Sequence, residues 1–243
     1  MRATHWPYHN YALDAHDRTL HFQRMKLYFS PLACSLATRI ALYEAGVSAD
    51  FVEVDPKTKT TTSGDDFLAV NPLGLVPALV LEGGDVLTEN TAILQLVAAT
   101  YPAAELAPHD GIGRARMHEW LGFIASELHK VVYMPLLDKT ASSAVRDYAV
   151  AKATPRFERV SQRLGEREFA LERFSIVDAY LFTVLHWTLA TPLSLKPWPI
   201  LRRYVERMSE HPSVARALSI EKPLYVKQVA RHTVSRVVDV FKG

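Results

Sequence analysis

The first part of the chain alternates short apolar runs with turn residues. Alternating polar and apolar positions over 26–29 predict a strand, and the apolar spacing over 35–45 predicts a helix that stops at Gly46. An apolar run over 51–54 predicts a second strand. These three elements form a β-α-β unit, for which we expect a right-handed crossover and parallel strands.

The next stretch predicts a second pair of strands. A short helix over 67–70 precedes a third strand over 78–81, and the glycines at 83–84 mark the turn into a fourth strand at 86–87. A helix then begins near Asn90, which we expect to be its N-cap.

Beyond Pro108 every periodic segment predicts helix. One apolar face joins residues at spacings of three and four, namely Met117, Trp120, Leu121, Ile124 and Leu128. Ser175 and Asp178 form a capping-box variant ahead of another apolar run. The change of element type places a domain boundary near 101–110. We expect an N-terminal extension over 1–24, an α/β domain over 25–104, an all-α domain over 110–220 and a C-terminal helical tail over 221–243.

Composition excludes several classes of function. The 243 residues are 49% hydrophobic and 22% charged, with a formal net charge of +2, which is typical of a packed globule without a field for nucleic acid or anionic membranes. No run approaches the ~20 apolar residues of a membrane span, and the first 24 residues lack the apolar core of a signal peptide. The single cysteine, Cys34, excludes a disulfide framework. We expect a cytoplasmic protein with no metal, nucleic-acid or membrane partner.

The leading 24 residues contain His5, His9, His16 and His21. Imidazoles at these positions are a minority hypothesis for a metal site. The favoured interpretation is an extension outside the fold, or a stretch upstream of a true start at Met25.

Cys34 is the first candidate for chemistry because it lies between a predicted strand and the first turn of a helix. Unpaired backbone N–H groups and the helix dipole favour a thiolate there, and can lower a cysteine pKa from ~8.5 into roughly the 3.5–7.5 range. The alternative is a small buried hydrophobe. The neighbouring hydroxyls of Ser30, Tyr28 and above all Ser35 are weaker candidates for assisting a thiolate.

Two further patterns point to peptide and anion binding. Val76 precedes Pro77 at the start of a strand, where backbone groups are free to pair with a peptide. Glu89 and Asn90 lie at a predicted helix start, where N–H groups can hold a carboxylate.

Five segments of the chain resemble bacterial beta-class cytosolic glutathione S-transferases, in the order of that family. They are MKLYFSPLACSLATRIALYEAG (25–46), FLAVNPLGLVPALVLEGG (67–84), LTENTAIL (87–94), FIASELHK (123–130) and FSIVDAYLF (174–182). The resemblance implies a thioredoxin-like, glutathione-binding N-terminal domain followed by a glutathione transferase-type helical domain, and a homodimer.

The resemblance also implies roles for individual residues. At the sulfur end, Cys34 matches the cysteine that faces the glutathione sulfur, and His129, with Lys130 beside it, matches the histidine that reaches toward it. A neutral imidazole there can act as a general base or a thiolate-stabilising donor.

The peptide end of glutathione has its own set of matches. Lys59 matches the residue that holds a glutathione carboxylate, Val76 the residue that pairs with the cysteinyl backbone, and Pro77 a cis proline. Glu89 and Asn90 match the pair that holds the γ-glutamyl end.

The chain departs from the family pattern in four places. Asn90 replaces a Ser or Gly, Gly122 replaces an asparagine near the sulfur, and 169–174 lacks a glycine, which predicts an altered loop. The tail past residue 220 is longer than usual, and we expect it to cover the substrate mouth or a flank of the dimer.

These observations favour an enzyme that conjugates glutathione to small electrophiles, with thiol–disulfide exchange through Cys34 on a disulfide substrate as a further activity. The alternative is a non-catalytic ligand- or partner-binding protein of the same fold. The electrophile pocket is expected at apolar positions that are equally suited to the core: Leu32, Met117, Tyr133 and Trp187.

Overall fold

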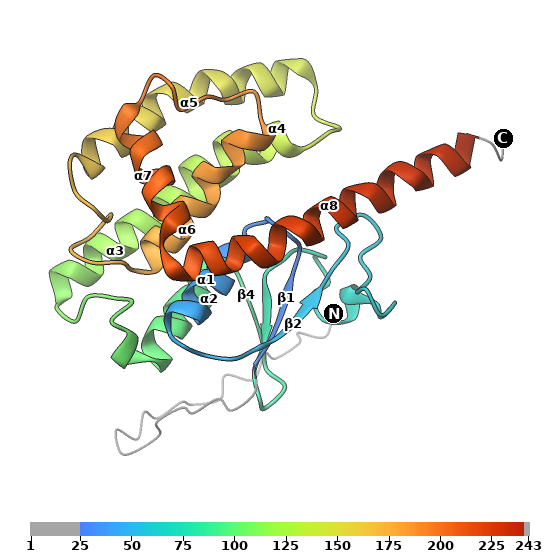
Figure 1. Ribbon diagram of the computed structural model, residues 1–243, viewed down its shortest axis with the longest axis horizontal. Helices are drawn as coiled ribbons and strands as arrows, with labels where there is room; N and C mark the ends of the chain where they lie inside the picture. The colour runs from blue at the N-terminus through green and yellow to red at the C-terminus, as the bar shows by residue number, and fades with distance from the viewer. Residues whose placement is uncertain (1–24, 241–243) are drawn as a thin grey trace, which may run out of the picture.

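The computed structural model describes residues 25–240, and residues 234–240 as helical backbone only. Figure 1 shows a small sheet beside a larger group of helices. The four strands are β1 (Lys26–Phe29), β2 (Asp50–Glu53), β3 (Ala78–Val80) and β4 (Val86–Thr88). Their order is β2-β1-β3-β4, with β1 parallel to β2 and the other neighbours antiparallel. The predicted β-α-β unit and hairpin are therefore confirmed.

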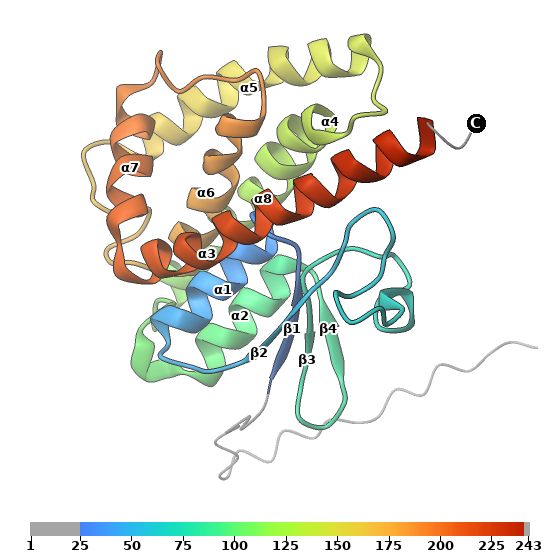
Figure 2. The same cartoon turned by 45° about the vertical axis from the view of Figure 1, so that its right-hand side comes forward.

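Helices lie against this sheet (Figure 2). Helices α1 (Ser35–Glu44) and α2 (Asn90–Thr100) pack together, and α1 also contacts helices of the second half. A small separate cluster of buried residues contains Phe67 from the single turn η1 (Phe67–Ala69), together with Val54 and Ala78. Since α1 is enclosed by the sheet and the helical half, its first residue lies at the junction of the two.

After Pro108 the described chain is helical. The elements are α3 (Gly111–Phe123), η3 (Ile124–Tyr133), α4 (Met134–Leu137), α5 (Ser143–Leu164), α6 (Ile176–His186), η4 (Trp187–Ala190), α7 (Pro199–Glu210) and α8 (Pro212–Val240), and the short turn η2 (Pro102–Ala104) precedes them. All five residues of the predicted apolar face are buried, so that face is core. The α/β plus all-α fold class is confirmed.

The segment η3 was predicted as ordinary α-helix, but the structure shows wider π-type turns. Met134 donates its N–H to the carbonyl of His129, five residues back. Pro135 follows, and a proline has no N–H to continue an α-helical ladder. Wide turns of this kind recur at functional sites, and both His129 and Lys130 lie in this one.

The predicted capping box at α6 is confirmed. Ser175 accepts from the helix start, while Asp178 Oδ2 accepts from the Ser175 backbone at 3.1 Å and hydroxyl at 3.0 Å. Asp178 Oδ1 also accepts from Ala170 N–H at 2.7 Å and Tyr204 OH at 2.9 Å. This buried carboxylate thus fastens the loop before α6 and helix α7 together.

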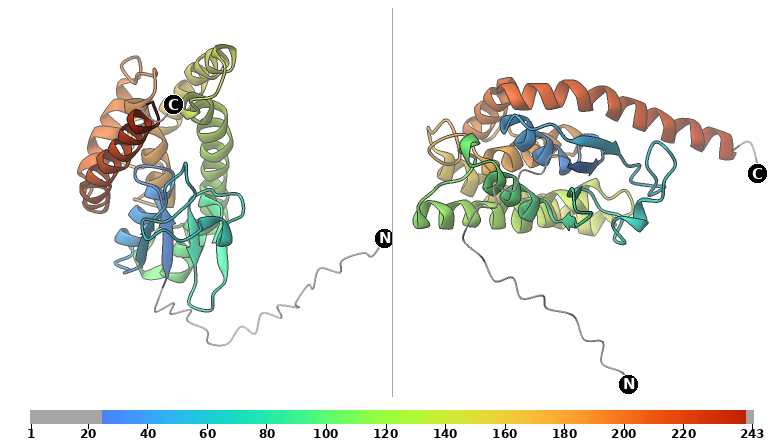
Figure 3. Two further views of the ribbon diagram at one scale, coloured as in Figure 1. Left: turned by 90° about the vertical axis from the view of Figure 1, so that its right-hand side faces the viewer. Right: turned by 90° about the horizontal axis from the view of Figure 1, so that it is seen from below.

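Helix α8 runs from Pro212 to Val240 along one side of the molecule, as Figure 3 shows. It is continuous through residue 221, where the helical tail was expected to begin. The predicted extension over 1–24, with its four histidines, lies outside the described residues. In the described part of the chain, no helix is both long and apolar enough to cross a membrane.

Candidate active site

Cys34 is the residue immediately before α1, at the end of the turn that leaves β1. Its side chain is partly buried, and its Sγ–H donates to the carbonyl of Val76 at 3.1 Å. The Val76–Pro77 peptide bond is cis, as the resemblance implied. Three of the predicted site residues therefore meet where α1 and β3 begin.

The predicted low pKa of Cys34 is wrong for this ligand-free chain. Burial raises the pKa of the Cys34 thiol to about 12. The Lys130 ammonium and the N–H groups of Cys34 and Ser35 act in the expected, lowering direction, but they do not outweigh burial. At neutral pH Cys34 is consequently a neutral thiol, able to donate a hydrogen bond.

Helix α2 begins one residue earlier than expected. Its N-cap is Glu89, at φ 65°, and Asn90 is the first helical residue. Asn90 is buried and its Oδ1 accepts from Thr38 Oγ1 at 2.9 Å, so its side chain is used across the helix pair and not as a cap. Its Nδ2 has no hydrogen-bond partner among the described residues. The exposed Glu89 opposes thiolate formation at Cys34 by its charge, which shows that the two are close.

Lys59 lies farther out, on the loop between β2 and η1. Its Nζ donates to the carbonyl of Gly74 at 3.0 Å, on the segment that leads into Val76. Gly74 has φ 61°, and a Cβ there would lie 2.9 Å from Lys59 Cδ, so glycine is needed at this contact. Lys59 itself has φ 58°, a left-handed conformation that this loop must hold in place.

His129 lies in the wall of the helical half. Its Nδ1 is 2.8 Å from Tyr180 OH, and its ring centroid is 4.9 Å from that of Trp187. Burial, with a smaller contribution from Lys130, lowers the pKa of His129 to about 4, so the imidazole is neutral at physiological pH. Burial raises the pKa of Tyr180, and the charge of Cys34 acts in the same direction, so Tyr180 is a neutral hydroxyl at physiological pH.

The turn before Cys34 is held from the helical half. Leu32 has φ 58°, its N–H donates to Glu221 Oε2 at 2.7 Å, and its carbonyl accepts from Trp187 Nε1 at 2.8 Å. The other oxygen of Glu221 lies 2.6 Å from Arg39 Nε, and both side chains are buried. Two helical-domain side chains therefore hold a strained backbone two residues before the thiol.

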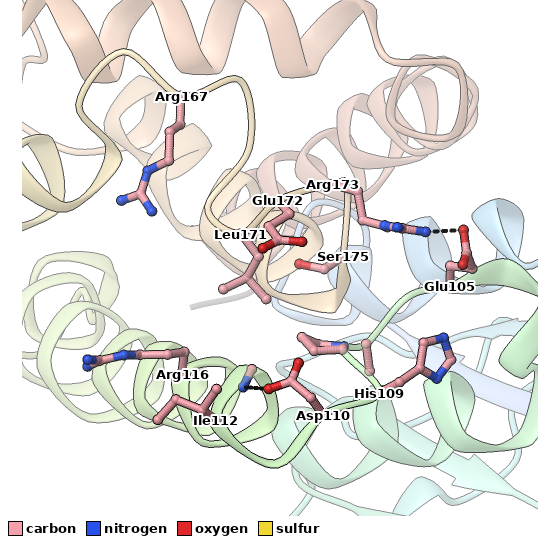
Figure 4. A pocket seen from close by; sticks show the side chains of 13 residues that line it. Glu105, His109, Asp110, Ile112, Arg116, Arg167, Leu171, Glu172, Arg173 and Ser175 are labelled. Atoms are coloured by element: carbon pink, nitrogen blue, oxygen red, sulfur yellow. Dashed lines mark hydrogen bonds and ion pairs between the residues drawn. The ribbon is translucent and has the colours of Figure 1, made fainter.

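Two cavities of the described structure lie elsewhere. One of 680 Å³ lies between the start of α3 and the loop before α6, and one of 350 Å³ adjoins it beside α2. Figure 4 shows that charged groups at the first are already engaged: Arg173 with Glu105, and Asp110 with the N–H of Gly113. Neither is lined by a residue predicted to bind glutathione. Of the residues expected at the electrophile pocket, Met117 and Tyr133 are both buried, at 4% and 0% exposed, which favours the core alternative, although Met117 also borders the smaller cavity.

Comparisons with known proteins agree with this arrangement. Residues 33–100 match the family model "Glutathione S-transferase, N-terminal domain", and residues 123–212 match "Glutathione S-transferase, C-terminal domain". The chain is 41% identical over 199 residues to glutathione S-transferase GstA of Escherichia coli O157:H7, covering 81% of this chain and 98% of that protein. It belongs to the glutathione S-transferase family.

Solved structures agree with this family assignment. The beta-class glutathione S-transferase of Sphingomonas chungbukensis superposes with a TM-score of 0.77 at 41% identity, over 81% of this chain and 98% of that one. A sphingomonad glutathione S-transferase complexed with glutathione gives a TM-score of 0.77 at 38% identity, over 81% and 98%. The resemblance to beta-class glutathione S-transferases is confirmed.

The sequence predictions for this glutathione S-transferase missed two site residues, Tyr180, which bonds His129, and Glu221, which bonds the Leu32 N–H. Trp187 was expected at the electrophile pocket, and the structure shows that its Nε1 donates to the Leu32 carbonyl. A tyrosine inside an apolar run usually has a polar partner, which was an available signal for Tyr180. Among the described residues, no group of three or more His, Cys, Asp or Glu could hold a metal ion.

Proposed function

We propose that this family member conjugates glutathione to small electrophiles at the site formed by Cys34, Val76 and the His129–Tyr180 pair. Its relatives are glutathione S-transferases, one of them solved with glutathione. The observation that supports this site most directly is the hydrogen bond from Cys34 Sγ–H to the Val76 carbonyl, at the start of β3.

The Val76 carbonyl is the natural partner for the cysteinyl N–H of glutathione, as in the addition of a strand to a sheet edge. When that N–H takes the carbonyl, the Cys34 S–H loses its partner and can turn to the glutathione sulfur. Because its pKa is about 12, Cys34 keeps this proton at neutral pH and donates it as a hydrogen bond. The glutathione sulfur, now accepting a hydrogen bond, is favoured as a thiolate.

Charge at the site acts in the same direction. Lys130 lowers the pKa of Cys34 through its ammonium charge and would do the same for a thiol placed beside it. His129 is neutral, so it serves as a hydrogen-bonding group positioned by Tyr180 and not as a second cation. The glutathione thiol would release its proton to solvent, and the thiolate would then attack the electrophile, whose leaving group departs with the bonding electron pair as the carbon–sulfur bond forms.

The two ends of glutathione carry carboxylates. Lys59, beside Gly74 on the approach to Val76, would hold one of them. Glu89 and Asn90 would hold the γ-glutamyl end, with Asn90 Nδ2, which also acts on Tyr180, as a donor and the Glu89 carboxylate as the acceptor for the α-ammonium. Lys59 would thus meet a carboxylate of opposite charge, Glu89 would meet the α-ammonium, and the Asn90 amide would donate a hydrogen bond to the γ-glutamyl carboxylate.

Thiol–disulfide exchange is a second candidate activity, because Cys34 is a free cysteine at this site and the residue is only partly buried. It requires the thiolate of Cys34, which the raised pKa makes scarce near neutrality. Intact-protein mass after incubation with oxidised glutathione measures it, with Cys34→Ser as the control. A reductant-reversible glutathione adduct on the unmodified chain alone supports exchange, and no adduct contradicts it.

Glutathione titration and turnover of a chloronitrobenzene electrophile test the main proposal. Lys59→Ala should weaken glutathione binding, while Cys34→Ala should retain binding and raise the pKa of the bound thiol. Binding without turnover of any electrophile would instead support the non-catalytic alternative. We also propose that the protein is a homodimer, is cytoplasmic and acts in detoxification. Analytical ultracentrifugation of the full chain tests the homodimer.

A further inference from the structure

Helix α8 continues well beyond the family-model match, which ends at residue 212. Glu221, Gln228 and His232 are spaced seven and four residues apart, on one face of the helix. This face turns toward the α/β half, and in Figure 1 the helix passes over the ends of β1 and β2. Beyond Glu221, whose contacts with Leu32 and Arg39 belong to the turn before Cys34, the helix makes a second set of contacts.

Gln228 forms the first contact of that set and is 5% exposed. Its Nε2 donates to Ser30 Oγ at 3.3 Å and to the Val54 carbonyl at 3.4 Å, and its Oε1 accepts from Ser30 Oγ at 3.4 Å. Ser30 begins the turn that leads from β1 to Cys34, and Val54 follows β2. One amide therefore connects the exits of two neighbouring strands.

Arg231 and His232 form the second contact. Arg231 pairs with Glu53, and His232 Nε2 lies 3.1 Å from Asp55 Oδ2, within ion-pair distance but outside hydrogen-bond geometry. Three consecutive residues at the end of β2, from 53 to 55, thus each meet a side chain of α8. Strand β2 is the edge of the sheet as described over 25–240, and within that range no further strand covers this position.

Asp55 organises the loop that carries Lys59. Its Oδ1 accepts from the N–H groups of Lys57 at 2.8 Å and Thr58 at 3.3 Å, and its carbonyl accepts from Lys59 N–H at 3.0 Å. The contact at Oδ2 is the one that comes from outside the loop. Helix α8 therefore contacts, at Asp55, the turn in which Lys59 has a left-handed backbone conformation.

We infer that the far part of α8 is a positioning element for glutathione, acting through Asp55 and Ser30 on the loops that present Lys59 and Cys34. Gln228 and His232 are the positioning residues. This inference rests on the proposed role of Lys59 as a carboxylate ligand. It assigns the long tail to the glutathione end of the site, whereas the sequence had suggested that the tail covers the substrate mouth or a flank of the dimer.

The test compares His232→Ala and Gln228→Leu with Thr233→Ala, a neighbouring exposed residue whose hydroxyl bonds within the helix. We expect the first two to raise the Kd and KM for glutathione about three- to tenfold, the cost of ordering one or two side chains on binding. The kcat of His232→Ala should stay within about twofold, since Asp55 and Lys59 do not touch the reacting atoms. His232→Gln should recover part of the loss, because its amide can donate to Asp55.

A double-mutant cycle separates this inference from the proposed role of Lys59. If His232 acts through Lys59, then His232→Ala should add little to Lys59→Ala. An unchanged Kd in His232→Ala and Gln228→Leu, or fully additive effects, would overturn the inference while Lys59→Ala still weakens binding. If Lys59→Ala itself leaves the Kd unchanged, the proposed carboxylate ligand is wrong, and the inference falls with it.

Discussion

Replacing Glu221 with methionine should destabilise the protein strongly. Glu221 and Arg39 are 0% and 2% exposed, and the guanidinium lies over the rings of Phe29 and Phe51 at 4.3 Å and 3.7 Å. Removing the carboxylate leaves a buried cation without its counter-ion and the N–H of Leu32 without its acceptor. Breaking a buried pair in this way costs about 3–5 kcal/mol.

The double variant Arg39→Met, Glu221→Met should recover much of that loss. Burial raises the pKa of Glu221 even though the charge of Arg39 opposes the shift. The loss of hydration on burying these two charges therefore costs free energy that their attraction offsets only in part. Without either charge, the remaining loss is the unpaired Leu32 N–H, about 1–3 kcal/mol. The double variant should therefore be more stable than Glu221→Met alone.

Urea unfolding followed by tryptophan fluorescence and circular dichroism measures these differences. Glu206→Met is the matched control, because Glu206 pairs with Arg202 at 3.6 Å on an exposed face, with side chains 62% and 59% exposed. It should change stability by less than about 0.5 kcal/mol. A Glu221→Met variant within about 1 kcal/mol of the unmodified chain would refute the reasoning, since an uncompensated buried charge costs more.

Three further predictions concern the site and its support. With a pKa of about 12, ligand-free Cys34 should alkylate slowly near neutrality, and the rate should rise about tenfold per pH unit from about pH 7 to about pH 10; a plateau below about pH 8 would contradict the raised pKa. Burial lowers the pKa values of His129 and His186 to about 4, below the ordinary 6.5. Each neutral imidazole therefore contributes stability that is fully present above about pH 6.5 and is lost as the pH falls toward 4. The free energy of unfolding lost in this window is about 3 kcal/mol at most for each histidine. His129→Gln should flatten the dependence of unfolding free energy on pH, and an unchanged slope would exclude this contribution. Asp178→Ala removes four hydrogen bonds to a buried carboxylate and should cost more than about 3 kcal/mol, seen as a lowered Tm, while a Tm shift of less than about 2 °C would contradict the fastening role.

Local patterns predicted much of this fold. The strand over 26–29, the helix ended by Gly46 and the capping box at Ser175 depend on neighbouring residues and on alternation, and the structure confirms them. The position of Cys34 before α1 was predicted for the same reason. A strand-to-helix junction is visible in the chain itself.

The missed features depend on residues far apart in sequence. The pKa of Cys34 depends on how deeply the helical half buries it, which no local pattern reports. Asn90 has the chemistry of an N-cap, yet Thr38 engages its side chain across the helix pair. Glu221 lies 189 residues from Leu32, and a glutamate in a helix gives no sign that it will be buried.

The pKa of glutathione's own thiol, measured in the complex by ultraviolet absorbance of the thiolate, tests the central claim most directly. Cys34 as a neutral donor predicts a bound thiol with a pKa below that of free glutathione, and a return toward the free value in Cys34→Ala. Cys34→Ser, which keeps a donor at this position, should remain close to the unmodified chain. An unshifted pKa in the unmodified complex, or the same shift in Cys34→Ala, would contradict the account.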